Sequence, residues 1–242
     1  AITVVGVKEK KDTFKQEEPT TLKGMLRAIL DNDQLLYTAI SMSLFMIGYV
    51  TTTSFGLYFF KYAYGDEGMY SIFAVILGIS QIGALAVFPL FSKHFSRKTL
   101  YTAATVLVVI GYLIFFFSPM NMLFIGLAGV LMFLGQAFIQ ILMLMFLADT
   151  VEYGQWKLGK RNESVTFSLQ PFINKMGGAI ASGIVGATVI ISGINDAVTP
   201  ADVTAQGLLL MKFAMMILPL LFVLAGYLVY RYKYKIDTAM YQ

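Results

Sequence analysis

Most of the residues that could do chemistry lie in one stretch, residues 148–175, with the sequence ADTVEYGQWKLGKRNESVTFSLQPFINK. The stretch leaves a long apolar run, crosses a charged patch and re-enters apolar sequence, so that Lys175 lies well inside the next apolar segment. A lysine at the depth of the hydrocarbon core costs about 2.5–3.5 kcal/mol. We therefore expect Lys175 to face an aqueous cavity or a carboxylate. The alternative is an ammonium group that reaches the membrane interface.

The charged patch contains four candidate residues, Asp149, Glu152, Lys157 and Glu163. They could form a gate that rearranges when a cavity changes sides, or they could be solvated charges that orient the chain in the membrane. Asp149 and Glu152 share a face if the preceding helix continues through them, and they could then contact a neighbouring bundle. Glu163 could begin the next helix, where the helix dipole favours an acid, or it could take part in coupling.

Uncharged polar residues within the apolar segments form a second group of candidates. Gln136 and Gln140 fall on one helical face, where they could hydrogen-bond a polyhydroxylated ligand or hold neighbouring helices together. Asn174 begins a ladder of small residues at every fourth position up to 186. Such a ladder is typical of helix–helix contact in membranes, and beside Lys175 it could also form the wall of a cavity.

The composition excludes several classes of protein. Hydrophobic residues make up 57% of the 242 residues and charged residues 13%, whereas soluble domains are usually about one-quarter charged. The chain has no cysteine, which excludes disulfides and thiolate metal sites. Its single histidine, His94, lies in a basic loop, which argues against His-based metal sites and Ser-His-Asp catalysis. We expect a polytopic membrane protein with no enzyme activity, no cofactor and no nucleic-acid partner. A membrane-embedded enzyme and a purely structural membrane domain are the rival interpretations.

Six apolar segments are each near or above the ~20 residues that a helix needs to cross ~30 Å of hydrocarbon. We predict transmembrane helices at 35–60, 69–91, 99–117, 121–147, 164–192 and 206–230. Residues 1–34 are predicted to form a cytoplasmic loop with a short amphipathic helix from 22 to 30, and residues 231–242 a cytoplasmic tail. Asn32 and its neighbours can cap the first span, and Pro219 predicts a kink in the last one.

Basic residues are distributed unevenly between the two sides of these spans. All of them except Lys61, Lys175 and Lys212 fall on one side, which the positive-inside rule makes cytoplasmic. Six spans with both ends in the cytoplasm follow from this distribution. The sequence begins at Ala1 within a charged stretch rather than at a start methionine, and we expect it to be a piece of a longer chain.

The motif ADTVEYGQWKLGKRNES, followed by the spacing of Gln170 and Lys175, resembles the loop and eleventh helix of the glycoside–pentoside–hexuronide:cation symporters. Melibiose permease carries the similar pattern ADxxDYGxxKLxxRxES, and a lysine follows at the same distance. The segments GKRNES and NKMGGAIASG are more similar still to the lactose permeases of lactic acid bacteria. Gln140 stands where melibiose permease has a tryptophan that faces the sugar. The resemblance covers essentially the whole chain.

The resemblance implies an all-α membrane protein whose six transmembrane helices form the C-terminal bundle of a major-facilitator-type transporter with twelve helices. It implies secondary transport of galactosides, above all lactose, by proton symport, by lactose/galactose exchange or by both. Another glycoside (raffinose, melibiose or a pentoside) with another cation is the alternative. No residue of the chain selects the cation, so the proton is carried over from the resemblance.

The resemblance also implies partners and a location. The partners are the sugar, membrane lipid and an N-terminal six-helix bundle that carries most of the sugar- and cation-binding acids. A C-terminal domain resembling phosphotransferase IIA would connect the carrier to proteins of the sugar phosphotransferase system. The location is the bacterial plasma membrane.

Roles for individual residues follow from the same resemblance. Asp149 and Glu152 match the two acids of the loop between helices ten and eleven. Lys157 and Glu163 match loop residues implicated in coupling and translocation. Lys175 matches a lysine of helix eleven that lies near the sugar and the cation.

Overall fold

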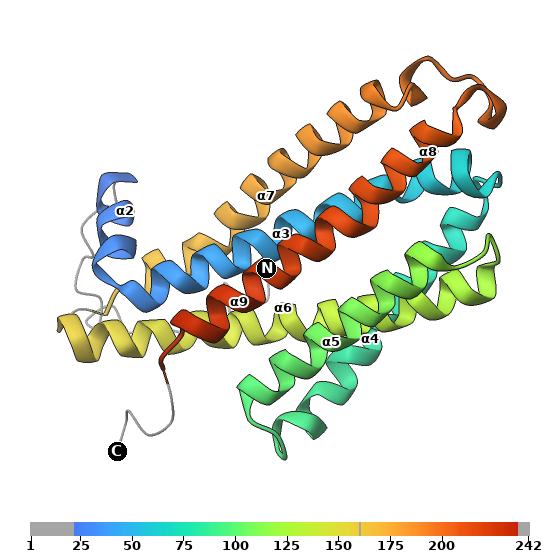
Figure 1. The fold of residues 1–242 in the computed structure, drawn as a ribbon. Helices are drawn as coiled ribbons and strands as arrows, with labels where there is room; N and C mark the ends of the chain where they lie inside the picture. The colour runs from blue at the N-terminus through green and yellow to red at the C-terminus, as the bar shows by residue number, and fades with distance from the viewer. Residues whose placement is uncertain (1–21, 160, 237–242) are drawn as a thin grey trace, which may run out of the picture.

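The computed structural model describes residues 22–159 and 161–236, and all regular secondary structure in this part of the chain is helical (Figure 1). In chain order the elements are α2 (Leu22–Asp31), α3 (Asp33–Tyr58), the π-helix η2 (Phe59–Tyr64), α4 (Met69–Ser92), α5 (Arg97–Phe117), α6 (Met122–Leu158), α7 (Glu163–Ile191), the 3₁₀ turns η3 (Ile194–Asp196) and η4 (Pro200–Asp202), α8 (Ala205–Lys212), the π-helix η5 (Phe213–Ile217) and α9 (Leu218–Lys233). Six spans are long and apolar enough to cross a membrane, because η2 extends α3 and because α8, η5 and α9 form one continuous span. The predicted all-α membrane architecture with six spans is confirmed.

The fourth span is longer than we predicted. We expected the helix to end at residue 147 and a polar loop to occupy 148–163, but α6 continues to Leu158 and the next helix begins at Glu163. Hydropathy marks where a helix leaves the apolar layer, and a solvated helix end can carry charged side chains beyond that point. The helix stops at Gly159, whose φ of 66° lies in the left-handed region that glycine adopts most easily.

The other predicted spans overlap the observed helices and differ from them mainly at the ends. The short helix α2 lies where we predicted an amphipathic helix. The rest of the predicted N-terminal loop, up to residue 21, lies outside the described residues, as does the predicted tail from residue 237. Asn32 caps α3 by accepting a hydrogen bond of 3.0 Å from the backbone N–H of Leu35.

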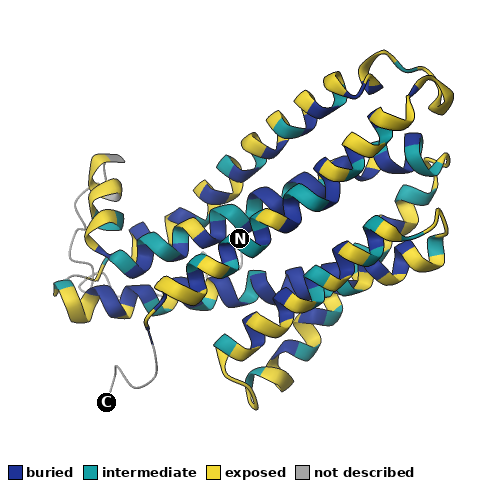
Figure 2. Cartoon of the chain, in the orientation of Figure 1, coloured by how far each residue is buried: buried dark blue, intermediate teal, exposed yellow. Residues whose placement is uncertain are grey.

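The helices form two groups that pack on each other (Figure 1). In one group α3 packs against α7 and α9, and in the other α6 packs against α4 and α5; α3 also contacts α6, and α5 contacts α9. The inward faces of α3, α6 and α9 are buried, whereas much of α7 is exposed (Figure 2). One end of the bundle contains the start of α3, the connection between α4 and α5, and the ends of α6 and α9. We call this the basic end, because Arg97, Lys98, Lys157 and Lys233 lie there.

Two glycines permit the close contact between α5 and α6. A Cβ atom on Gly111 of α5 would lie 2.7 Å from the backbone N of Met132. A Cβ atom on Gly135 of α6 would lie 2.7 Å from the carbonyl O of Ala104. Because side chains do not approach backbone atoms this closely, both positions need glycine, and the two helices pack with their backbones close together.

The last span carries the expected distortion, in the form of the π-helix η5 directly before Pro219. Proline has no N–H, so the carbonyl of Met215 lacks the donor that an α-helix would supply. The hydroxyl of Thr52 donates to Met215 O instead, at 2.8 Å. Thr52 also lies 2.6 Å from the Tyr112 hydroxyl, to which Gln136 Nε2 donates at 3.1 Å. A buried hydrogen-bond chain thus joins α3, α5, α6 and the last span.

Replacing Thr52 with valine is expected to destabilise the bundle, because the nearly isosteric methyl group cannot donate to Met215 O. A buried acceptor left unpaired costs about 1–3 kcal/mol, and hydrogen bonds within membranes average about 0.6 kcal/mol. We expect a loss near 1 kcal/mol, which corresponds to a fall of about 2–4 °C in the unfolding midpoint. The midpoint can be followed by size-exclusion chromatography of heated, detergent-solubilised protein. Thr52→Ser keeps the hydroxyl and is the control; an equal loss in both variants would assign the effect to packing.

The connection between α7 and α8 is ordered by a carboxylate at the end opposite the basic end. Asp202 accepts hydrogen bonds from the backbone N–H groups of Thr199 at 2.7 Å and Val198 at 3.1 Å, and from the Thr199 hydroxyl at 2.9 Å. The hydrogen bonds from Thr199 lower the pKa of the Asp202 carboxyl. Their contribution to the stability of the fold is therefore complete above the ordinary pKa of a carboxyl group. It is lost only as the pH falls through the lowered pKa of Asp202.

Candidate functional site

A cavity of about 230 Å³ lies between α3, α4, α6 and α7. Its apolar wall consists of Met42, Phe45, Met46, Leu85, Ala137, Ile141, Met143 and Leu144. Its polar wall consists of four carboxamides, Gln81, Gln140, Gln170 and Asn174. We call it the amide cavity.

The amide cavity offers hydrogen bonds without charge. Each carboxamide has two N–H donors and a carbonyl acceptor, and no charged side chain among the described residues lines the cavity. Ligand pockets are typically apolar with a few placed polar groups. The described chain also contains no cluster of His, Cys, Asp or Glu that could hold a metal ion. This wall therefore suits an uncharged molecule with several hydroxyl groups.

Three of these four carboxamides were candidates from the sequence, and the fold brings them together. Gln170 and Asn174 lie one turn apart on α7, and Gln140 faces them from α6. Gln81 of α4 was missed, although an isolated amide within an otherwise apolar span is a signal that could have identified it. Its Nε2 donates a hydrogen bond of 2.8 Å to the Tyr49 hydroxyl of α3.

Gln136 lies in the core rather than at the cavity. It is 0% exposed, donates to the Tyr112 hydroxyl at 3.1 Å, and is not among the residues that line the amide cavity. Gln140, one turn later on the same helix, does line the cavity. Of the two roles that the sequence left open for Gln136, contact between helices is the one that this geometry supports.

Lys175 is exposed on α7, directly after Asn174. It is not part of the cavity wall, and it forms no ion pair with any residue in the described ranges. Further along α7, Cβ atoms on Gly178, Gly183 and Gly186 would meet nothing within 4 Å. This face of α7 is thus left uncovered by the other described helices. The aqueous or carboxylate environment expected for Lys175 remains a prediction.

At the basic end, Asp149 joins three elements. It forms an ion pair with Arg97 at the start of α5 and accepts a hydrogen bond of 3.0 Å from the Tyr234 hydroxyl, just after α9. Burial raises the pKa of the Tyr234 phenol and the Asp149 carboxylate raises it further, so Tyr234 keeps the proton that it donates. Glu152 is exposed and lines, with Asp149 and Arg97, a cavity of about 590 Å³. From the sequence, Arg97 was expected only to help set the topology of the chain in the membrane.

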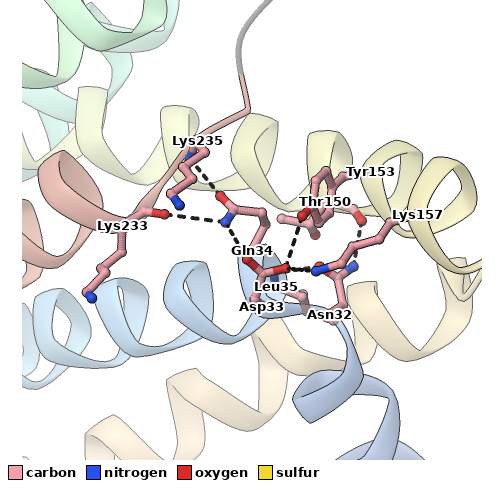
Figure 3. A network of polar contacts seen from close by, with 9 residues as sticks. All are labelled: Asn32, Asp33, Gln34, Leu35, Thr150, Tyr153, Lys157, Lys233 and Lys235. Carbon is pink, nitrogen blue, oxygen red and sulfur yellow. Dashed lines mark hydrogen bonds and ion pairs between the residues drawn. The ribbon is translucent and has the colours of Figure 1, made fainter. Parts of the chain in front are cut away.

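A second polar network at the basic end ties the first turn of α3 to α6 (Figure 3). Asp33 accepts hydrogen bonds from Lys157 Nζ at 2.6 Å and from the Tyr153 hydroxyl at 3.0 Å. The side chain of Asn32 donates to the carbonyl O of Thr150 at 2.9 Å. Asp33 was predicted only to help begin the helix, so its role as the partner of Lys157 comes from the structure.

The same turn of α3 also holds the end of the last span (Figure 3). Gln34 is 0% exposed, and its Nε2 donates to the carbonyl O of Lys233 at 3.3 Å. Its Oε1 accepts a hydrogen bond of 2.7 Å from the backbone N–H of Lys235. One buried carboxamide therefore satisfies two backbone groups where α9 ends.

Three of the four charged candidates form separate ion pairs in the described structure, and the fourth, Glu152, lines the same cavity as Asp149. Asp149 pairs with Arg97, and Lys157 pairs with Asp33. Glu163, the first residue of α7, pairs with Arg161 at 3.1 Å. Their predicted roles in coupling are therefore not tied to a single cluster within this chain.

Burial predicts which contact at the basic end matters more for stability. The side chains of Lys157 and Asp33 are each 40% exposed, and exposed ion pairs are typically worth about 0.2–1 kcal/mol. Gln34→Ala leaves two backbone groups without partners, and each of them costs about 1–3 kcal/mol of stability if no water molecule hydrogen-bonds to it. We expect Gln34→Ala to lower the unfolding midpoint by several times as much as Lys157→Ala, measured in the same detergent. Equal shifts would contradict this ranking.

The chain is similar in sequence to known sugar-transport proteins. The profile of the family described as MFS/sugar transport protein matches residues 1–238. The raffinose carrier protein of Pediococcus pentosaceus is 34% identical over 222 residues, which cover 91% of this chain and 35% of that protein. The lactose permease of Leuconostoc lactis is 29% identical over 233 residues, which cover 96% of this chain and 36% of that protein. The chain thus spans about a third of the length of these relatives.

A third relative extends the range of sugars among similar proteins. The isoprimeverose transporter of Lactiplantibacillus pentosus is 27% identical over 196 residues, which cover 79% of this chain and 40% of that protein. All three relatives are named as carriers, permeases or transporters of sugars, and none is named as an enzyme.

Proposed function

The chain belongs to the MFS/sugar transport protein family, and from this premise we propose that it forms the C-terminal half of a secondary transporter for galactosides. Lactose is the substrate that we put first, carried by proton symport, by exchange for galactose or by both. The six spans, the family and the likeness to sugar permeases support this proposal. Family membership points to transport rather than to enzyme catalysis.

The observation that carries the proposal is the wall of the amide cavity. Gln81, Gln140, Gln170 and Asn174 provide donors and acceptors for hydroxyl groups, and the apolar wall beside them suits the carbon face of a sugar ring. A charged sugar such as a uronide would find no counter-charge on this wall. An uncharged di- or trisaccharide is therefore the substrate class that this half supports best. Raffinose is the second candidate, favoured by the 34% identity to a raffinose carrier.

Coupling to a proton is proposed to depend on the other half of the carrier. None of the acidic residues in the described chain lines the amide cavity, so an acid that binds and releases the proton would come from an N-terminal six-helix bundle. Lys175, exposed on α7, would pair with such an acid or with the sugar. Asp149, Glu152, Lys157 and Glu163 would adjust their contacts at the basic end as the two halves rock.

The surroundings of the carrier complete the proposal. The basic end faces the cytoplasm of a bacterial cell, because the positive-inside rule places Lys and Arg there, and the six helices lie in the plasma membrane. Both ends of the chain are then cytoplasmic. A phosphotransferase-like domain beyond the C-terminal end would connect transport to the sugar phosphotransferase system.

Counterflow in proteoliposomes tests the proposal directly. The complete carrier is reconstituted with unlabelled lactose inside and labelled lactose outside. We expect rapid uptake of label that raffinose or melibiose inhibits and a glucuronide does not, and accumulation of label when an inward proton gradient is imposed. Absence of lactose exchange, or preference for the anionic sugar, would overturn the proposed function. Exchange without a response to the proton gradient would restrict it to exchange.

A further inference from the structure

Gln81 differs from the other carboxamides of the amide cavity because a second helix fixes its orientation. Its Nε2 donates to the Tyr49 hydroxyl at 2.8 Å. Tyr49 in turn stacks on Phe45, with ring centroids 6.2 Å apart and planes at 15°, and Phe45 is itself part of the cavity wall and 1% exposed. The position of the Gln81 amide is therefore set by a half-buried tyrosine on α3, which stacks on a buried phenylalanine of the same helix.

This arrangement decides what Gln81 can offer to a ligand. A carboxamide that donates through Nε2 to a neighbouring hydroxyl retains its carbonyl Oε1 as an acceptor. Gln140 offers a hydrogen-bond donor instead, because its Nε2 is buried without a hydrogen-bond partner in the described structure. A buried donor without a partner is unfavourable, and an oxygen atom of a ligand at this position would pair with it. The cavity thus places an acceptor on α4 and a donor on α6.

We propose that Gln81, oriented by Tyr49, is a specificity-determining residue that accepts a hydrogen bond from one particular hydroxyl group of the bound glycoside. Gln81 contacts the sugar, and Tyr49 is a positioning residue that acts through Gln81. The inference rests on the proposed function and deepens it. It makes a residue of α4 partly responsible for the selectivity of the carrier among sugars that differ in the orientation or presence of one hydroxyl group. A site built to hydrogen-bond a hydroxyl group of its ligand discriminates against an analogue that lacks this hydroxyl.

The rival role for this pair is contact between α3 and α4 without any ligand. Gln136 supplies a matched control for that role, because it is also a glutamine that bonds a tyrosine hydroxyl across helices, and it does not line the cavity. The same replacement, glutamine to methionine, therefore separates a ligand contact from a purely structural one.

The experiment measures how well lactose and each of its monodeoxy analogues inhibit counterflow by the complete carrier. Gln81→Met is expected to weaken inhibition by lactose about tenfold, which equals about 1.4 kcal/mol. One monodeoxy analogue is expected to inhibit wild type and Gln81→Met equally, because it lacks the hydroxyl that Gln81 binds. Tyr49→Phe is expected to weaken inhibition by lactose less than Gln81→Met does. It should also reduce the difference between inhibition by lactose and inhibition by that same analogue. Gln136→Met is expected to keep the wild-type order of all analogues.

Two results would overturn the inference, and they can be told apart. If wild type exchanges lactose and Gln81→Met ranks every analogue as wild type does, Gln81 is only a contact between helices and the proposed function stands. If wild type exchanges no galactoside, the proposed function fails and this inference fails with it.

Discussion

Replacing Lys175 with leucine is expected to abolish concentrative uptake of lactose by the complete carrier, while the protein still inserts into the membrane. Lys175 lies exposed on α7 beside Asn174 of the amide cavity, and no described residue pairs with it. Because an ammonium within the bilayer costs about 2.5–3.5 kcal/mol, we infer that water, sugar or an acid of the other half compensates its charge. Uptake of labelled lactose by energised cells, with immunoblotting of the membrane fraction, measures both outcomes.

Lys212 provides the matched control for this prediction. It also lies within a span, but its Nζ donates to the carbonyl O of Phe116 at 3.1 Å, near the end of α5. Its charge is therefore accommodated by a helix end, and Lys212→Leu should leave accumulation near the wild-type level. Wild-type accumulation by Lys175→Leu would remove Lys175 from the transport pathway and assign it to the lipid-facing surface.

The double replacement Gln140→Leu with Gln170→Leu is expected to weaken lactose binding by about 10–100-fold. A neutral hydrogen bond contributes about 0.5–1.5 kcal/mol, and each 1.4 kcal/mol is a factor of ten in affinity. The two residues belong to different helices of one cavity wall, so each single variant should lose part of the affinity. Titration calorimetry of the purified carrier with lactose measures the change.

Gln136→Leu separates this effect from a general loss of structure. Gln136 is one turn from Gln140 on α6, but it bonds Tyr112 in the core. We expect this variant to lower the unfolding midpoint and to leave the lactose affinity of the folded protein unchanged. An unaltered affinity in the Gln140/Gln170 double variant would show that the amide cavity does not hold the sugar.

The membrane architecture could be predicted from the sequence because each span must present about 20 apolar residues to lipid. The same principle explains where the prediction failed. Helix α6 continues beyond the apolar layer to Leu158, and hydropathy carries no information about a solvated helix end. The π-helix before Pro219 was anticipated only as a kink, since its form depends on the hydroxyl that Thr52 supplies from α3.

The candidate site was harder to predict, because its residues meet only in three dimensions. Gln140 and Asn174 were identified as amides within apolar spans, and Gln170 was identified by its spacing from Lys175 in the motif that resembles the symporter family. Gln81 was missed, although the same signal was present in α4.

The network at the basic end shows the limit of local reasoning most clearly. Lys157 bonds Asp33, 124 residues earlier in the chain. No periodicity or spacing connects the two residues, and only the packing of α3 against α6 brings them together.

The most direct test of the central claim uses a single cysteine in the amide cavity. The chain has no cysteine of its own, and Ala137 lines the cavity without contributing a hydrogen-bonding side chain. Ala137→Cys, on α6, is made in a complete carrier that is otherwise free of cysteine, and Ile190→Cys, at the C-terminal end of α7 and outside the cavity wall, is the control. We predict that lactose, and not a glucuronide, slows maleimide labelling at position 137 over the concentration range that saturates transport, with no effect at position 190. Labelling at position 137 that is indifferent to saturating lactose, in a variant that still transports it, would contradict the proposed sugar site.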